Sequence, residues 1–277
     1  MNYRHAFHAG NFADLLKHAS LIAVLSRFMA KPGPITAVDT HAGAGLYDLA
    51  GPEAERSREA RSGAMRLTRG DLPPVMAALR RAVEARNPAG SGPLRVYPGS
   101  PVLIAELLRP QDRLIACELR PDVHAQLEAA FAPFRPRAQA LATDGYLELS
   151  AIARRRPERL FALIDPPFER ADDYVRLAEA AAATLDAVPD ACLLIWTPLK
   201  DLETFDACVR RLEPIAPERT LIAEARLRPL TDPMRLNGCA LIAVNAPPAA
   251  EPDIEAACAF VVEALGDAGG RAKLWRP

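Results

Sequence analysis

The sequence predicts an α/β protein built around one mainly parallel β-sheet, with helices on both of its faces. Short apolar segments that suit buried strands alternate with longer stretches that suit helices, which is typical of β-α-β units. The last two apolar segments are joined by a connector without a helical pattern, which predicts an antiparallel pair at one edge of the sheet. Polar residues follow several predicted strands, at the ends where such sheets bind ligands.

The predicted elements fit one domain that spans residues 1–277. Strands are expected at 35–38, 113–118, 160–164, 192–197, 220–226 and 239–245. Helices are expected at 11–29, 121–132, 172–186, 201–213 and 253–265.

The interval 48–92 departs from this alternation. It has helical spacing and no strand-like segment, and a crossover between parallel strands does not need that length. We therefore expect a helical insertion over residues 48–92. Its charges suit either a surface that faces nucleic acid or a solvated helix with i,i+4 pairs, which is the commoner case. They are Arg56, Arg58, Arg61, Arg66 and Arg69 against Glu53, Glu55 and Glu59.

Composition argues against several other classes of protein. The formal net charge is −1, which is unlike a strongly basic nucleic-acid coat, although a local basic face remains compatible. No apolar run approaches the roughly 20 residues of a membrane span, and the N-terminal stretch is polar, so we expect a cytoplasmic protein. The five cysteines are scattered without a C-x-x-C pair, so neither a disulfide framework nor a cysteine-based zinc site is expected.

Three predicted strand ends carry side chains that suit a nucleoside. A glycine-containing turn, DTHAGAG, follows the first strand, but it is not the G-x-G-x-x-G fingerprint of dinucleotide binding. Glu118 ends the next strand, and a carboxylate there can accept from both hydroxyls of a ribose. Asp144 and Gly145 follow, and this carboxylate can accept from an adenine amino group. Helix-dipole contacts or an Asx turn would also explain these acids.

The fourth strand end is Asp165-Pro166-Pro167-Phe168. Proline has no N–H and a fixed φ, so the carbonyl groups of this turn are rigid and available as acceptors. The Asp165 carboxylate and the Pro166 carbonyl can together accept both protons of an exocyclic amino group. Phe168 can stack on the base, which is worth roughly 1–3 kcal/mol. The turn suits methylation of an amino group, although Asp followed by Pro also begins ordinary helices.

At this point the sequence resembles a known family. D-P-P-(F/Y/W) after a fourth strand is similar to the catalytic motif of adenine-N6 methyltransferases that use S-adenosylmethionine. The whole set of motifs resembles the RlmJ family, which methylates N6 of an adenine in 23S ribosomal RNA, and the resemblance runs from residue 3 to about 245. It rests on YRHAFHAGNFADLLKH (3–18), DTHAGAG (39–45), YPGSP (97–101), CELRP (117–121), DGY (144–146) and DPPF (165–168).

The resemblance implies a Rossmann-like class I methyltransferase fold with an inserted helical subdomain, and direct in-line methyl transfer in the DPPF site. The resemblance assigns catalytic roles to Asp165, Pro166 and Phe168. The resemblance also implies that S-adenosylmethionine is contacted by His18, His41, Ser100, Glu118, Asp144 and Gly145. It further implies that 23S ribosomal RNA is contacted by Tyr3, Arg4 and His5. Lys17 is a candidate to neutralise the carboxylate of the cofactor. Phe168 and Thr197 stand where the family pattern has tyrosine.

Other functions fit the residues less well. His5, His8, His18, His41 and Asp39 do not have the spacing of a metal site, so no metal is expected and a metal hydrolase is disfavoured. A cytosine-C5 methyltransferase would need a nucleophilic cysteine beside the turn. A methyltransferase for amino groups of DNA or protein remains a competitor. An inactive RNA-binding scaffold would not need an intact DPPF turn. The lack of a repeat favours a monomer.

Overall fold

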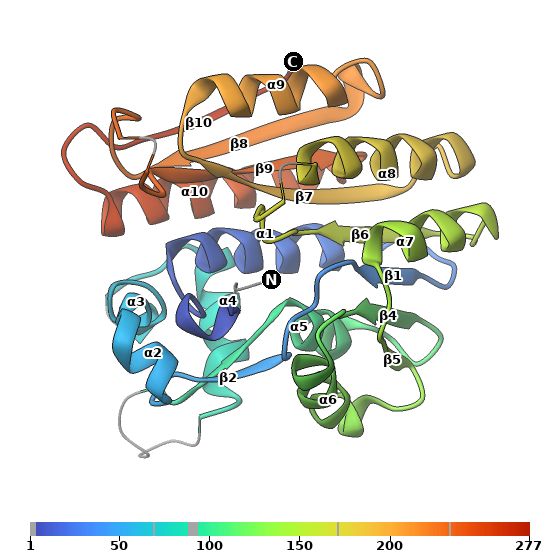
Figure 1. Ribbon diagram of the computed structural model, residues 1–277, viewed down its shortest axis with the longest axis horizontal. Helices are drawn as coiled ribbons and strands as arrows, with labels where there is room; N and C mark the ends of the chain where they lie inside the picture. Colours follow the sequence, from blue (N-terminus) through green and yellow to red (C-terminus); the bar gives the residue numbers. More distant parts are fainter. Residues whose placement is uncertain (1–3, 69, 88–93, 171, 233) are drawn as a thin grey trace.

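The computed structural model describes residues 4–68, 70–87, 94–170, 172–232 and 234–277. One eight-stranded sheet runs through the molecule with helices on both faces, as Figure 1 shows. Its strand order is β10-β8-β9-β7-β6-β1-β4-β5. The strands are β1 (Thr36–Asp39), β4 (Arg113–Cys117), β5 (Ala138–Leu141), β6 (Leu160–Ile164), β7 (Cys192–Leu199), β8 (Thr220–Arg226), β9 (Gly238–Val244) and β10 (Arg271–Trp275).

The parallel part of the sheet comprises β5, β4, β1, β6 and β7. β9 lies antiparallel between β7 and β8, and β10 adds a further antiparallel strand beyond β8. The predicted mainly parallel α/β fold with antiparallel pairing at one edge is therefore confirmed. β5 and β10 were not predicted from the sequence. Both include exposed or half-exposed positions, so neither has the apolar pattern of an interior strand.

The helices cover the two faces of the sheet in two sets. One face packs against α1 (Phe12–Phe28), α5 (Ser100–Leu107) and α10 (Glu251–Leu265). The other packs against α7 (Gly145–Arg154), α8 (Asp173–Ala187) and α9 (Leu202–Leu212). Side chains of each strand alternate between these two cores, as in β6, where Phe161 and Leu163 face the first set and Ala162 faces the second. α6 (Pro121–Ala130) packs beside β5.

The segment 48–92 is mainly helical where the structure describes it. It contains α2 (Pro52–Ser57), α3 (Glu59–Ser62), a 3₁₀ turn (Ala64–Thr68) and α4 (Pro74–Glu84). A short antiparallel pair, β2 (Leu46–Asp48) and β3 (Val96–Pro98), brackets it and was not predicted. Apolar residues of α4 join the core formed with α1 and α10. The view of this segment as an insertion within one domain stays a prediction, and Arg69 lies outside the described residues.

Glu84 forms the expected kind of i,i+4 pair, at 3.8 Å from Arg80, whereas Glu53, Glu55 and Glu59 pair at other spacings. Glu59 accepts hydrogen bonds from His8 at 2.9 Å and from Asn11 at 3.0 Å. Glu53 lies 3.8 Å from Arg4, and Glu55 pairs with Arg61, six residues further along. The contacts of Glu53 and Glu59 fasten the N-terminal stretch to α2 and α3, and the pair of Glu55 with Arg61 joins these two helices.

No helix in the described part of the chain combines the length and apolar character needed to cross a membrane. The five cysteines are all buried and unpaired with one another.

Candidate active site

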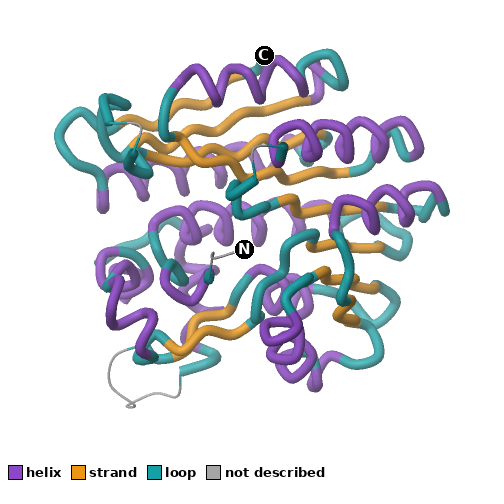
Figure 2. Tube along the Cα trace, viewed as in Figure 1, coloured by secondary structure: helices purple, strands orange, loops and turns teal. Residues whose placement is uncertain are grey.

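A cavity of about 700 Å³ opens at the carboxyl ends of the parallel strands. The loops that follow β1 and β6 line this cavity. Figure 2 shows the course of these loops in the backbone trace. Every predicted site residue that the structure describes lines this cavity, although the predictions came from segments scattered over the chain. They are Arg4, His5, His18, His41, Ser100, Glu118, Asp144, Gly145, Asp165, Pro166 and Phe168. Tyr3 lies outside the described residues.

The DPPF turn leaves β6 at the wall of the cavity. Asp165 Oδ2 accepts a hydrogen bond from Lys17 Nζ at 2.6 Å, which ties the turn to α1. Pro166 is buried, and Phe168 has a φ of 51°, in the left-handed region that a phenylalanine rarely adopts. Strained residues of this kind persist where the surrounding structure holds them, and they are frequent at active sites.

Aromatic rings surround Phe168. Its ring centroid lies 4.6 Å from that of Tyr174 and 5.9 Å from that of Trp196. Trp196 lines the cavity from β7, whereas the next residue, Thr197, is fully buried and does not line it. Successive side chains of a strand point to opposite faces, which explains the difference. An aromatic side chain of β7 therefore reaches the cavity one position before Thr197.

Lys17 contacts carboxylates of the protein itself. Its ammonium group lies 2.8 Å from Asp14 and 2.6 Å from Asp165. Burial would lower the pKa of Lys17, but these two carboxylates outweigh it and hold the pKa well above its usual value. Burial likewise opposes ionisation of Asp14, yet Lys17 and His5 keep the pKa of that carboxyl well below its usual range. The group is therefore a charged network, and a role for Lys17 toward the cofactor stays a prediction.

The two predicted cofactor histidines are neutral. His18 Nδ1 lies 2.9 Å from the Tyr97 hydroxyl, and burial lowers the pKa of His18 to about 3. His41 Nδ1 lies 2.8 Å from the Thr40 hydroxyl, and burial lowers the pKa of His41 to about 4. His41 also meets the ring of Tyr146 edge-on at 4.8 Å. Both imidazoles can therefore contribute polar contacts without adding positive charge.

Asp144 and Glu118, the two acids predicted to contact the cofactor, differ in the hydrogen bonds and ion pairs that their carboxylates already form within the protein. Asp144 caps α7 by accepting from the N–H groups of Tyr146 and Leu147, and it pairs with Arg176 at 2.6 Å. The Asx-type contact noted from the sequence is thus present, and a contact with adenine stays a prediction. Glu118 accepts the N–H of Arg120 at 2.8 Å, and burial raises the pKa of Glu118.

Ser100 begins α5 and donates its hydroxyl to Asp39 Oδ2 at 2.7 Å. Burial raises the pKa of Asp39 to about 7. Ser100 thus satisfies a buried carboxyl group as well as lining the cavity.

Two glycines let the backbone close around the site. Gly43 has a φ of 64°, and a Cβ there would meet the Tyr47 hydroxyl at 2.1 Å. At Gly145 a Cβ would lie 1.9 Å from the carbonyl oxygen of Thr40, so α7 can begin this close to the loop after β1 only with glycine.

Asp14, Trp196 and Arg176 are among the residues of the cavity wall that sequence reasoning missed. Asp14 precedes Lys17 by three positions on a predicted helix, so spacing alone placed the two side chains on one face. The period of two along β7 could have selected Trp196. Arg176 had no local signal, because its partner Asp144 is 32 positions away. Among the described residues no group of three or more His, Cys, Asp or Glu side chains is arranged to hold a metal ion.

Comparisons with known proteins give a consistent result. Residues 33–277 match the family model described as "Ribosomal RNA large subunit methyltransferase D, RlmJ". Over 248 residues the chain is 34% identical to ribosomal RNA large subunit methyltransferase J of Escherichia coli, with coverage of 89% of this chain and 88% of the relative. The Haemophilus influenzae protein of the same name is 30% identical over 266 residues, covering 96% and 94%.

A solved structure has the same architecture over nearly the full length. The crystal structure of a protein from Legionella pneumophila superposes with a TM-score of 0.87 at 26% identity. The match covers 97% of this chain and 98% of that one.

Proposed function

This chain belongs to the RlmJ family of ribosomal RNA large subunit methyltransferases, and we propose that it methylates N6 of an adenine in 23S ribosomal RNA with S-adenosylmethionine. One observation carries the proposal beyond family membership. The DPPF turn and the residues predicted to hold the cofactor line a single cavity at the carboxyl ends of the strands. An amino acceptor and a nucleoside-type cofactor could therefore meet there.

The cavity residues fit S-adenosylmethionine. A volume of about 700 Å³ lies within the usual range for small-molecule sites. Glu118 offers a carboxylate for the ribose, and Gly43 and Gly145 leave space where any side chain would collide with the backbone or with Tyr47. We assign His18, His41, Ser100, Glu118, Asp144 and Gly145 to this part of the site. When bound, S-adenosylmethionine supplies an activated methyl group for direct, in-line transfer to N6.

The other residues act on the adenine. The Asp165 carboxylate and the Pro166 carbonyl accept the two protons of the exocyclic amino group, which directs the nitrogen lone pair toward the methyl donor. Phe168 stacks on the base that has left its RNA stack, which offsets part of the few kcal/mol of unstacking. Trp196 and Tyr174 pack against the Phe168 ring. Orientation and electrostatics then supply most of the acceleration, so a covalent enzyme intermediate is not needed.

The N-terminal stretch is assigned to the RNA. Arg4 and His5 line the cavity, and a turn over residues 8–11 joins η1 (His5–Phe7) to α1, which carries Lys17. We extend the assignment to Tyr3 from the resemblance. We also propose that the protein acts as a monomer in the cytoplasm, where ribosomal RNA is available.

The experiment uses methyl-labelled S-adenosylmethionine with three acceptors: deproteinised unmodified 23S ribosomal RNA, duplex DNA and total protein. Nucleosides from the labelled RNA are then separated by chromatography. We expect the label in N6-methyladenosine from the RNA. Label confined to DNA or protein would contradict the proposed acceptor, and label on another RNA nucleoside would contradict the proposed chemistry.

A further inference from the structure

We propose that Asp14 is a positioning residue of this active site, which holds Lys17 so that Lys17 orients the catalytic Asp165. The inference deepens the proposed function and rests on it, because Asp165 is taken to accept from the amino group of the adenine. Asp14 itself is not placed on the substrate.

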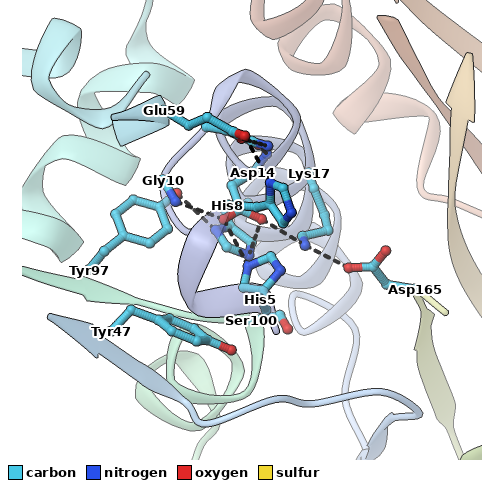
Figure 3. Close-up of polar contacts among 12 residues, drawn as sticks. His5, His8, Gly10, Asp14, Lys17, Tyr47, Glu59, Tyr97, Ser100 and Asp165 are labelled. Atoms are coloured by element: carbon cyan, nitrogen blue, oxygen red, sulfur yellow. Dashed lines mark hydrogen bonds and ion pairs between the residues drawn. The ribbon is translucent and has the colours of Figure 1, made fainter. Parts of the chain in front are cut away.

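The two oxygens of Asp14 have different partners, which Figure 3 shows. Oδ1 lies 2.8 Å from Lys17 Nζ, and Lys17 Nζ in turn donates to Asp165 Oδ2 at 2.6 Å. Oδ2 accepts the N–H of Gly10 at 2.9 Å and lies 3.1 Å from His5 Nε2. One carboxylate therefore links the loop before α1, the N-terminal stretch and the DPPF turn.

Burial makes this arrangement costly unless every charge is paired. Asp14 is 1% exposed and Lys17 is 4% exposed. Removing one partner from a buried ion pair leaves an uncompensated charge and is strongly destabilising. Lys17 stands between two carboxylates, so the network keeps one negative charge in excess where the amino group of the substrate is expected.

A simple capping role does not account for the contacts of Asp14. The N-cap of α1 is Asn11, whose side-chain oxygen accepts the N–H of Asp14. The contact of Asp14 Oδ2 with Gly10 fastens the preceding loop, as a structural acid would. Asp14 Oδ1 does not hold this loop. It contacts the Lys17 ammonium within the cavity wall.

The geometry gives Asp14 a specific effect on Asp165. Within the described part of the chain, Oδ2 of Asp165 takes the hydrogen bond from Lys17, and no hydrogen bond reaches its Oδ1. Oδ1 is therefore available to the amino group of the adenine. If Asp14 no longer held part of the Lys17 ammonium, Lys17 could turn toward both oxygens of Asp165. Sharing Lys17 between two acids thus fixes the Asp165 carboxylate and keeps one of its oxygens open.

The test is the variant Asp14→Asn, assayed with 23S ribosomal RNA and saturating S-adenosylmethionine. An asparagine has one acceptor oxygen, so it cannot serve Lys17 and the Gly10 N–H together. We expect kcat and kcat/KM to fall equally, by about 100-fold, as for a misplaced reacting group. Cofactor affinity should stay within about threefold by calorimetry, because Asp14 is assigned no contact with the cofactor.

Lys17→Met shows whether Asp14 acts through Lys17. If it does, the Asp14→Asn/Lys17→Met double variant should be no slower than Lys17→Met alone within about threefold. Multiplicative losses would overturn the inference, since they would mean that Asp14 works independently of Lys17. A kcat for Asp14→Asn within threefold of wild type would overturn it directly.

Asp112→Asn is the matched control. Asp112 is also a buried acid, 2% exposed, and it accepts the N–H of Ile35 at 2.9 Å outside the cavity. The Asp112→Asn variant should have a lower Tm than wild type, with little change in kcat. If Asp14→Asn does not fold, Asp14→Glu keeps the charge but displaces Lys17, and it should still lower kcat; an unchanged kcat would overturn the inference. Failure of the wild type to methylate the RNA would instead contradict the proposed function.

Discussion

Glu118 is the residue proposed to accept from the ribose hydroxyls of the cofactor. It lies at the cavity wall, where burial raises the pKa of its carboxyl group and the N–H of Arg120 orients one oxygen. We predict that Glu118→Ala weakens binding of S-adenosylmethionine by at least about tenfold, the size expected for losing a hydrogen bond to a charged group. Calorimetry measures this directly. An unchanged Kd would remove Glu118 from the ribose contact.

Gly145 gives a prediction about close packing. A Cβ at this position would lie 1.9 Å from the carbonyl oxygen of Thr40, so Gly145→Ala must push α7 away from the loop after β1. We predict that the free energy of unfolding falls by about 1–3 kcal/mol, which urea titration would show. Leu147→Ala on the same helix is the control, because Leu147 is 67% exposed. Equal stability of the two variants would contradict the steric account.

Single residues differ in how well the sequence predicts them. Asp165, Pro166 and Phe168 lie within four consecutive residues, so their proposed roles can be recognised in one motif. The pairing of Lys17 with Asp165 joins positions 148 residues apart, and no local pattern reports such a contact. The resemblance named Lys17 as a candidate, but its pairing with Asp165 required the structure.

At the scale of elements, β10 depends on one buried acid of β8. Trp275 Nε1 donates to Glu224 Oε1 at 2.6 Å, and Glu224 is also bound by Arg226. Arg271, Ala272 and Lys273 of β10 are exposed, so apart from the backbone ladder the strand is held by Leu274, which packs against one core, and Trp275, which packs against the other. We predict that Trp275→Phe raises amide hydrogen exchange in β10 while kcat changes less than about twofold, because the strand is remote from the cavity. Unchanged exchange would show that the ladder alone is sufficient.

The length and burial of each strand explain which elements the sequence predicted. Interior strands such as β6 are buried throughout and stand out as apolar runs. β5 and β10 each flank the sheet, and the pair β2 and β3 is only three residues long in each strand. Such short or half-exposed strands form because a neighbouring strand supplies hydrogen bonds, and that neighbour is not visible in local sequence.

For the whole molecule, buried histidines should control stability in acid. Burial lowers the pKa of His18 to about 3, against an unfolded value of about 6.5. Between these values the unfolded chain binds the proton and the folded chain does not, so stability falls as the pH decreases. We predict that His18→Gln reduces this slope by up to about 1.4 kcal/mol per pH unit, measured by urea titration at several pH values.

Asp39 provides a control, because its contribution to stability changes with pH in the opposite direction to that of His18. Burial raises the pKa of Asp39 to about 7, so its contribution is present at low pH and is lost as the pH rises toward that value. Asp39→Asn should therefore make the loss of stability in acid steeper, whereas His18→Gln makes it shallower. Parallel changes in both variants would contradict the assigned protonation states.

The central claim is that the DPPF turn transfers the methyl group, and single-turnover kinetics of Asp165→Ala test it most directly. Wild type and variant are each mixed with labelled S-adenosylmethionine and 23S ribosomal RNA, with cofactor affinity measured in parallel. We predict that Asp165→Ala forms no detectable N6-methyladenosine while its cofactor Kd stays within about threefold of wild type. Methyl transfer at the wild-type rate by Asp165→Ala would contradict the claim.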